Sequence, residues 1–388
     1  MSLTRFDQAN DILQQEAATL ITSTWTGNRN DMDNHFTASS QASFTTATSS
    51  GQFFIEVYNE HTSSANSEVQ YSVAYGNRLG SGSLDFTNDT GSFGLGASKV
   101  TYNQFRQLIF QDETQNFTFG SHTPNDIYVI NVNRARYKQK LNPGSLNLRL
   151  AGTSAHGKTY IQTSIDLTDD SVTNGAGATS NPGNKLGEFY NIVSGSSGVL
   201  SGSLTNQLTI NGSGSTFGLF YPEAGIIILN CDAFSQSAAV SASSAATPTN
   251  PHDAGNLVPE RQKNSANKNH LRLLYSMMIG GPASQSIATN PHAKFVVDTA
   301  ENVESKYFFV RARNSEYNYT NNPSFVDNTN NILHSSMKLN PKTFITTVGL
   351  YNDSNELLAV AKLSQPVAKD FTKEALIRVK LKKIYIIN

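Results

Sequence analysis

Residues 343–363, TFITTVGLYNDSNELLAVAKL, contain the pattern that decides the fold class. Polar and apolar side chains alternate along residues 343–351 and again along 357–363, which is the period of a half-buried β-strand. Between the two runs, residues 352–355 (NDSN) have the composition of a hairpin turn. The sequence therefore predicts an antiparallel hairpin with one inward row, formed by Val348, Leu350, Leu357, Ala359, Ala361 and Leu363.

A further strand is expected near the C-terminus, over residues 376–381. Its alternation places Val379 and Leu381 toward the same core and Arg378 and Lys380 toward solvent. Similar short runs rich in β-branched and aromatic residues recur throughout the chain, bounded by Gly, Ser and Asn. Further strands are expected over residues 52–58, 68–75, 126–133, 145–150, 159–167, 189–193, 204–210, 225–230, 295–298 and 306–319.

Helical spacing is confined to three short segments, at residues 7–20, 98–110 and 270–279. The fold class is therefore mainly β: antiparallel sheets in a sandwich-like arrangement, with a few short helices and long polar loops. Composition divides the chain into an N-terminal helix and extended arm (1–50), a β-rich domain (51–234), a Ser/Ala/Asn-rich linker or long loop (235–268) and a C-terminal β domain (269–388).

The charge balance excludes one class of function. Lys and Arg total 29 and Asp and Glu total 30, which gives a formal net charge of −1. A protein that neutralises many phosphates needs a cationic excess, so we expect no nucleic-acid partner. No segment approaches the roughly 20 consecutive apolar residues of a membrane span, so we expect no membrane partner. The N-terminus also lacks the pattern of a secretory signal.

Three features invite a catalytic or binding interpretation, and none of them is convincing. Gly152-x4-Gly157-Lys158-Thr159 matches a phosphate-binding loop formally, but the next residues alternate like a strand, whereas such a loop must open a helix. Asp166, Asp169 and Asp170 are grouped like cation ligands, yet a solvated turn explains them better. The eight histidines lack metal-ligand spacing. We therefore expect no catalytic residues, no metal, no cofactor and no enzyme activity.

The single cysteine, Cys231, follows an apolar run and is expected to be buried and inert. It excludes an internal disulfide.

Aromatic and cationic residues in polar surroundings are the candidate interface. Trp25 and Phe36 lie in the polar arm over residues 21–50, which has too few apolar residues for a core of its own, and Phe234 precedes the second polar stretch. We expect such aromatics to dock into an adjacent subunit. Arg134, Arg136, Lys138 and Lys140 share one face if the preceding strand continues through them, and that face would form the rim of a protein–protein contact.

Several blocks of the sequence are distinctive when taken together. They are residues 125–134 (NDIYVINVNR), 137–138 (YK), 141–144 (LNPG), 220–229 (FYPEAGIIIL), 307–318 (YFFVRARNSEYN), 322–325 (NPSF), 344–353 (FITTVGLYND) and 356–364 (ELLAVAKLS). These blocks resemble virion structural proteins of tailed bacteriophages, especially the T4-like and marine contractile-tailed phages (myoviruses). The resemblance extends over most of the chain from about residue 50 and is densest after residue 300. It implies a role in the capsid–tail machinery and no catalytic residues.

We therefore expect a structural subunit of a phage virion, in the baseplate or in the tail and neck machinery, that acts by protein–protein assembly. Its expected partners are other virion proteins, in a symmetric homo- or hetero-oligomeric ring, and its expected location is the virion after synthesis in the host cytoplasm. One alternative is a receptor- or glycan-binding tail protein, and a second is a capsid-decorating protein. A virion-borne glycan hydrolase would need a convergent pair of carboxylates, which the sequence does not indicate.

Overall fold

The chain divides into two compact units. The computed structural model describes residues 11–29, 31, 36, 54–80, 98–156, 159–174, 183–201, 208–237, 257–259, 269–277, 294–318, 323–339 and 341–384. The larger unit comprises Leu20–Glu301, and the smaller unit comprises Met1–Thr19 together with Asn302–Asn388. Among the described residues both units are built of antiparallel strands with few short helices, which confirms the expected fold class.

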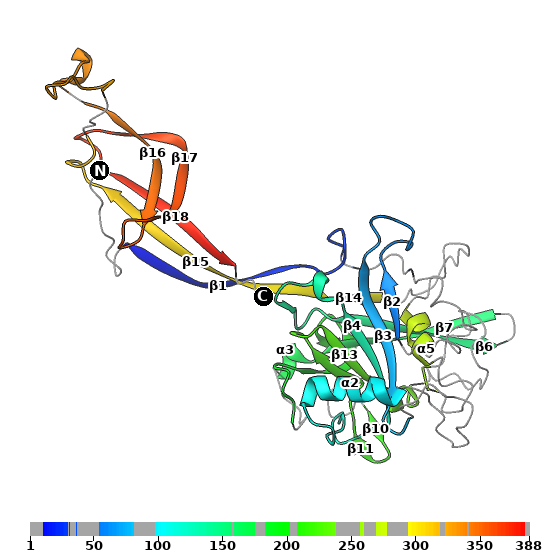
Figure 1. The fold of residues 1–388 in the computed structure, drawn as a ribbon. Helices are drawn as coiled ribbons and strands as arrows, with labels where there is room; N and C mark the ends of the chain where they lie inside the picture. The colour runs from blue at the N-terminus through cyan, green and yellow to red at the C-terminus, as the bar shows by residue number, and fades with distance from the viewer. Residues whose placement is uncertain are drawn as a thin grey trace. The chain divides into compact units, whose positions relative to one another are not determined.

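A ten-stranded antiparallel sheet forms the larger unit (Figure 1). Its strands follow the order β14-β6-β7-β8-β12-β13-β4-β3-β2, and β9 pairs with β8. In sequence order these strands are β2 (Phe54–Tyr58), β3 (Val69–Asn77), β4 (Asp126–Val132), β6 (Asn147–His156), β7 (Thr159–Asp169), β8 (Tyr190–Ser196), β9 (Val199–Leu200), β12 (Gly218–Tyr221), β13 (Ile226–Asn230) and β14 (Lys294–Val296).

Short elements complete the larger unit. The described helices are α2 (Ser98–Phe110), α3 (Ser171–Asn174), α4 (Cys231–Phe234) and α5 (Asn269–Met277), and η1 (Arg134–Arg136) is a 3₁₀ turn. Strands β10 (Thr209–Ile210) and β11 (Ser213–Gly214) form a small hairpin, and β5 (Lys140–Leu141) pairs with β15 (Asp298–Ala312).

The large sheet is buried on both faces at strand β13. All five residues of this strand are buried, and successive side chains enter opposite cores. Ile227 and Leu229 join the core that contains α4 and α5, whereas Ile226 and Ile228 join the core covered by α2. A strand covered on both faces is expected to be a continuous apolar run, as Ile226–Leu229 is.

Helix α2 packs closely against β3 because β3 contains a glycine at the contact. A Cβ atom placed on Gly76 would lie 2.8 Å from the backbone nitrogen of Tyr102 in α2. That approach allows Tyr102, Phe105 and Ile109 to enter the core beside Val129 and Ile228. The helical spacing predicted for residues 98–110 is confirmed.

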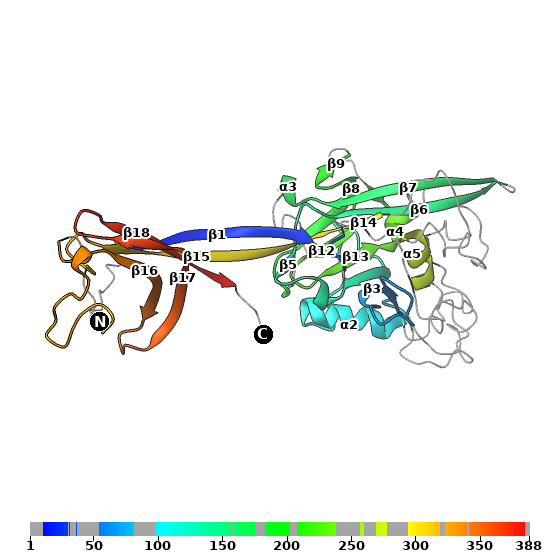
Figure 2. The same ribbon diagram turned by 90° about the horizontal axis from the view of Figure 1, so that it is seen from above.

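The smaller unit has two layers (Figure 2). One is a sheet in the order β1-β15-β18, from β1 (Ile12–Ser23), β15 and β18 (Ala375–Ile384); β1 and β15 have residues in both units. The other is the hairpin of β16 (Thr343–Tyr351) and β17 (Leu357–Lys369), and η5 (Ser335–Met337) precedes it. Val348 and Leu350 of the hairpin pack against Ile377 and Val379 of β18.

The predicted hairpin and C-terminal strand are confirmed, with one correction to the inward row of each. Val348, Leu350 and Val379 are buried as expected, and Ala359, Ala361 and Leu363 pack against them. Leu357 is instead 52 % exposed, because a register shift between Leu350 and Tyr351 turns it toward the outer face. Leu381 is 38 % exposed, because it lies opposite Lys306, beyond the residues that the hairpin covers.

Two further expectations are wrong. Residues 12–20 form part of strand β1 rather than a helix, since pairing with β15 outweighs a weak local helical pattern; residues 7–10 lie outside the described part. The predicted boundary at residues 235–268 does not separate the units either. Helix α5 and strand β14 belong to the larger unit, because their apolar residues enter its core. Residues 238–256 and 260–268 of that predicted linker lie outside the described part.

We expect Leu350→Ala to lower the free energy of unfolding of the smaller unit by about 2–5 kcal/mol, the usual cost of emptying a buried leucine site. Leu350 is 6 % exposed and is one of four buried apolar residues in the described part of this core. Chemical denaturation of the full chain measures the loss. Ser354→Ala, in the exposed turn, is the control and should change little. Equal stability of the two variants would contradict this packing.

Candidate functional site

The outer face of the β16–β17 hairpin, away from the core, is rich in exposed apolar side chains. Phe344 is 59 % exposed, Leu358 67 % and Val360 60 %. The register shift at the end of β16 brings Leu357 beside Tyr351, and both side chains lie over Gly349. We call these five residues, Phe344, Tyr351, Leu357, Leu358 and Val360, the hairpin outer face. Four of them lie at the turn end of the hairpin and Phe344 lies at its other end. Exposed apolar residues gathered on one face of a small unit are typical of protein–protein contact sites.

The two units differ strongly in how many of their large apolar side chains are buried. Twelve of the twenty large apolar side chains that are exposed among the described residues belong to residues 302–384. Among the described residues, the core cluster of that unit contains four buried apolar residues, whereas the two core clusters of the larger unit contain many more. A small unit with so little buried apolar surface gains little stability by itself, so a partner that covers the hairpin outer face would stabilise it.

Trp25, a predicted docking residue, belongs instead to the core of the chain itself. Its side chain is 2 % exposed, its indole Nε1 donates to the carbonyl oxygen of Phe295 at 2.9 Å, and its ring packs on Phe295 and Tyr71. Phe234 is also buried, in the same core. The expectation that these aromatics dock into another subunit is therefore wrong. The polar arm contributes a core residue because the larger sheet supplies the rest of the core.

Phe36 keeps part of its surface accessible. It forms a two-bond bridge with Tyr58, in which each backbone N–H donates to the other residue's carbonyl oxygen, at 3.1 and 2.7 Å. Its ring lies edge-on to the imidazole of His61, with 6.3 Å between the centroids. Residues 32–35 and 37–53, which flank it in the sequence, lie outside the described part. A contact of Phe36 with another subunit stays a prediction.

The four predicted cations do not share a strand face. β4 ends at Val132, and Asn133 caps the 3₁₀ turn η1 by accepting a hydrogen bond from the backbone N–H of Ala135. This turn rotates Arg134 and Arg136 out of alternation with Lys138 and Lys140. The strand expectation fails here because an Asn side chain that can cap a turn competes with continued β pairing.

Each of these cations also has a partner within the larger unit. Arg136 pairs with Glu68 at 2.6 Å, Lys138 with Glu301 at 3.0 Å and Lys140 with Glu188 at 3.0 Å. Arg134 lies over the ring of Tyr137, with 4.6 Å from its guanidinium carbon to the centroid, and donates to the carbonyl oxygen of Tyr137. Hydrogen bonding from Thr26, together with the charge of Arg136, lowers the pKa of Glu68. Three of the four predicted interface cations are therefore neutralised by carboxylates of the same unit, and the fourth, Arg134, is held by Tyr137.

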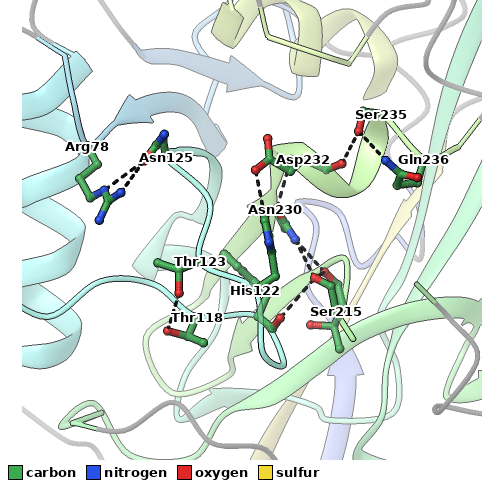
Figure 3. A network of polar contacts seen from close by, with 12 residues as sticks. Arg78, Thr118, His122, Thr123, Asn125, Ser215, Asn230, Asp232, Ser235 and Gln236 are labelled. Carbon is green, nitrogen blue, oxygen red and sulfur yellow. Dashed lines mark hydrogen bonds and ion pairs between the residues drawn. The ribbon is translucent and has the colours of Figure 1, made fainter. Parts of the chain in front are cut away.

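One polar network has the residue types of a catalytic site, and Figure 3 shows it. His122 Nε2 lies 2.9 Å from Asp232 Oδ2, and Asn230 Nδ2 donates to Ser215 Oγ at 3.0 Å. Ser215 Oγ donates to the carbonyl oxygen of Phe119 rather than to His122, so serine and histidine are not arranged as nucleophile and base. The network instead fixes the loop before β4 to the start of α4, where Asn230 accepts from the backbone N–H of Asp232.

No sequence pattern indicated the partner of His122. Asp232 is 110 residues away along the chain, and only the pairing of β13 with β4 brings the two segments together. We expect His122→Ala to lower the stability of the folded chain by about 1–2 kcal/mol through loss of a half-buried polar contact. Chemical denaturation of the full chain measures the loss. Unchanged stability of the variant would show that the contact with Asp232 does not hold this loop in place.

The remaining sequence candidates have structural roles among the described residues. Asp166 receives two hydrogen bonds from Arg149, Asp169 accepts from the backbone N–H of Gly144, and Asp170 accepts two bonds from Asn191. Burial raises the pKa of Asp169. No group of metal-ligating side chains gathers there or elsewhere in the described ranges. Cys231 is buried as expected.

The stretch that matched a phosphate-binding loop forms the β6–β7 hairpin, in which His156 lies opposite Thr159. This confirms the strand predicted after it. Residues 157 and 158 lie outside the described part.

Comparisons with known proteins give no relative. No family model, curated protein or solved structure matches this chain. Among the helices that the structure describes, none has the length and apolar character required to cross a bilayer.

Proposed function

We propose that this chain is a structural subunit of a tailed-phage virion, in the baseplate or the tail and neck machinery, and that it works by protein–protein assembly rather than by catalysis. The observation that carries the proposal is the hairpin outer face: five exposed apolar residues on a unit whose own core is small. Covering such a face with a neighbouring subunit removes apolar surface from water and adds the stability that the unit lacks.

The resemblance to phage structural proteins supports the same proposal from the sequence. Its densest blocks, residues 307–318, 344–353 and 356–364, lie within β15, the loop after it, and the hairpin. The densest of these blocks therefore lie mainly in the unit that holds most of the exposed large apolar side chains among the described residues.

The test is the double variant Leu358→Glu/Val360→Glu, introduced into the phage that encodes this chain. Both side chains are exposed, so the purified variant should fold and unfold as the parent chain does. Incorporation into particles should fall sharply, because two carboxylates would have to lose water on a buried apolar contact. Ser354→Glu, in the turn of the same hairpin, is the matched control. Normal incorporation of the double variant would overturn the role of this face.

The alternatives predict different outcomes in the same experiment. If the chain were a receptor- or glycan-binding tail protein, particles carrying the double variant would assemble normally and fail to adsorb to cells. A capsid-decorating protein would be found by labelled antibody on the head rather than on the tail. Either outcome would replace the proposed location.

A further inference from the structure

Strand β18 has one paired edge and one open edge. It pairs with β15 over ten residues, from Ala375 opposite Ala312 to Ile384 opposite Val303. No described strand pairs with its other edge, where it ends the β1-β15-β18 order. An open edge presents backbone N–H and C=O groups to which a further strand can pair. This edge is separate from the hairpin outer face.

Side chains alternate along β18 in a way that distinguishes its two faces. Ile377 and Val379 point into the core of the smaller unit, whereas Arg378 and Lys380 are exposed on the opposite face. Both cations lie over the ring of Tyr307 in β15, at 5.2 and 5.4 Å from its centroid. No ion pair among the described residues involves either cation, in contrast to Arg136, Lys138 and Lys140.

This charge pattern disfavours a second copy of β18 as the occupant of the edge. Two β18 strands paired edge to edge would bring their exposed cations close together, and like charges that face one another across a ladder are destabilising. Cations on an open strand are also a known way to prevent such self-pairing. A segment with carboxylates at the matching positions would instead be attracted.

We propose that the open edge of β18 receives an extended segment of another protein, which adds a strand to the sheet. Its carboxylates, at alternate positions, would lie beside Arg378 and Lys380, and its apolar residues would extend the core next to Ile377 and Val379. Main-chain bonds would supply affinity, and the alternating side chains would supply specificity. The inference rests on the proposed function in one respect, namely that the chain works by assembly.

The experiment measures peptide binding to the purified full-length chain. The probe is a synthetic peptide in which Glu and Val alternate between solubilising ends. It has about ten residues, so it is as long as a long β-strand. A second peptide has Lys in place of Glu, and a third has the Glu/Val sequence with alternate backbone nitrogens methylated. The Glu/Val peptide should bind, and binding should weaken as NaCl rises from about 0.05 to 0.3 M. The Lys/Val peptide and the methylated peptide should bind at least about tenfold more weakly.

Charge reversal gives the decisive comparison. Arg378→Glu/Lys380→Glu should weaken binding of the Glu/Val peptide by at least about tenfold and should allow the Lys/Val peptide to bind. Lys338→Glu/Lys362→Glu makes the same change in net charge at two other exposed positions, and it should leave binding unchanged. Circular dichroism of both variants checks that the fold is retained.

Three results would overturn the inference: no binding of the Glu/Val peptide, equal binding of the methylated peptide, or equal loss of binding in both double variants. The last two would indicate attraction to net charge without strand addition. None of these results bears on the hairpin outer face, because incorporation of Leu358→Glu/Val360→Glu into particles is measured separately. The two proposals can therefore fail independently.

Discussion

Acidification from pH 6.5 to about 3 should remove up to about 5 kcal/mol of folding free energy through one residue, His270. This histidine lies in α5, is fully buried, and neither imidazole nitrogen has a hydrogen-bond partner in the described structure. Burial lowers the pKa of His270 from 6.5 to about 3. Between these two values the unfolded chain binds a proton that the folded chain does not, so stability falls as pH falls.

The matched variant is His270→Leu. It should show a much weaker loss of stability when denaturation curves at about pH 7 and pH 4.5 are compared, because the titrating group is gone. At neutral pH it should be more stable than the parent by about 1–3 kcal/mol, since a buried polar ring without partners is replaced by an apolar side chain. Asp169 has the opposite effect on the pH dependence of stability, because burial raises its pKa. It is present in both the parent chain and His270→Leu, so the comparison between them does not include its effect. An unchanged pH dependence in His270→Leu would contradict the burial of this imidazole.

Replacing Asp126 by Ala should lower the free energy of unfolding by about 2–6 kcal/mol, since each buried donor left without an acceptor costs about 1–3 kcal/mol. Asp126 begins β4 and is fully buried. Its Oδ1 accepts a hydrogen bond from the Tyr75 hydroxyl at 2.5 Å and a second from Asn77 Nδ2. Burial, with the nearby Asp126 carboxylate, raises the pKa of Tyr75 well above its ordinary value.

Asp126→Asn provides the comparison, because the amide retains an oxygen that can accept the bond from Tyr75. It should cost less than half as much as Asp126→Ala, measured by chemical denaturation of the full chain. Asp353→Ala, at an exposed turn position, controls for loss of a negative charge and should be near neutral. Equal losses in the Ala and Asn variants would show that the acceptor oxygen is not what Asp126 contributes.

Period-two alternation predicted much of the β structure, because it depends only on which face of a strand is buried. It located the hairpin of β16 and β17, strand β3 and the paired runs of β6 and β7. It failed at Leu357, because a register shift is set by pairing rather than by local sequence. It failed also at residues 12–20, where the partner strand β15 is almost 300 residues away.

The candidate site was less predictable, because exposure depends on which elements lie over a residue. Composition marked Trp25 as a surface anchor, but Phe295 and Tyr71 enclose it. In the sequence, Leu358 and Val360 look like ordinary strand residues. They are candidate contact residues only because no described element covers them. Lys369 shows the opposite error, because no sequence pattern indicated that this lysine is fully buried. Its ammonium group donates to one oxygen each of Asn314, Asn318 and Asp370.

The smaller unit is built from two segments that lie far apart in the sequence, Met1–Thr19 and Asn302–Asn388, and this affects when it can fold during synthesis. Its first strand, β1, is synthesised long before its partner strand β15: the Thr19 hydroxyl donates to the side-chain oxygen of Asn302, 283 residues later. At about 5–20 residues per second, β1 waits roughly 15–60 s for β15. Folding of the intervening unit shortens the loop that must close and lowers its entropic cost. The hairpin outer face and the edge of β18 therefore form after the larger unit has been synthesised, so a nascent chain that extends only to Glu301 presents neither contact surface to its neighbours.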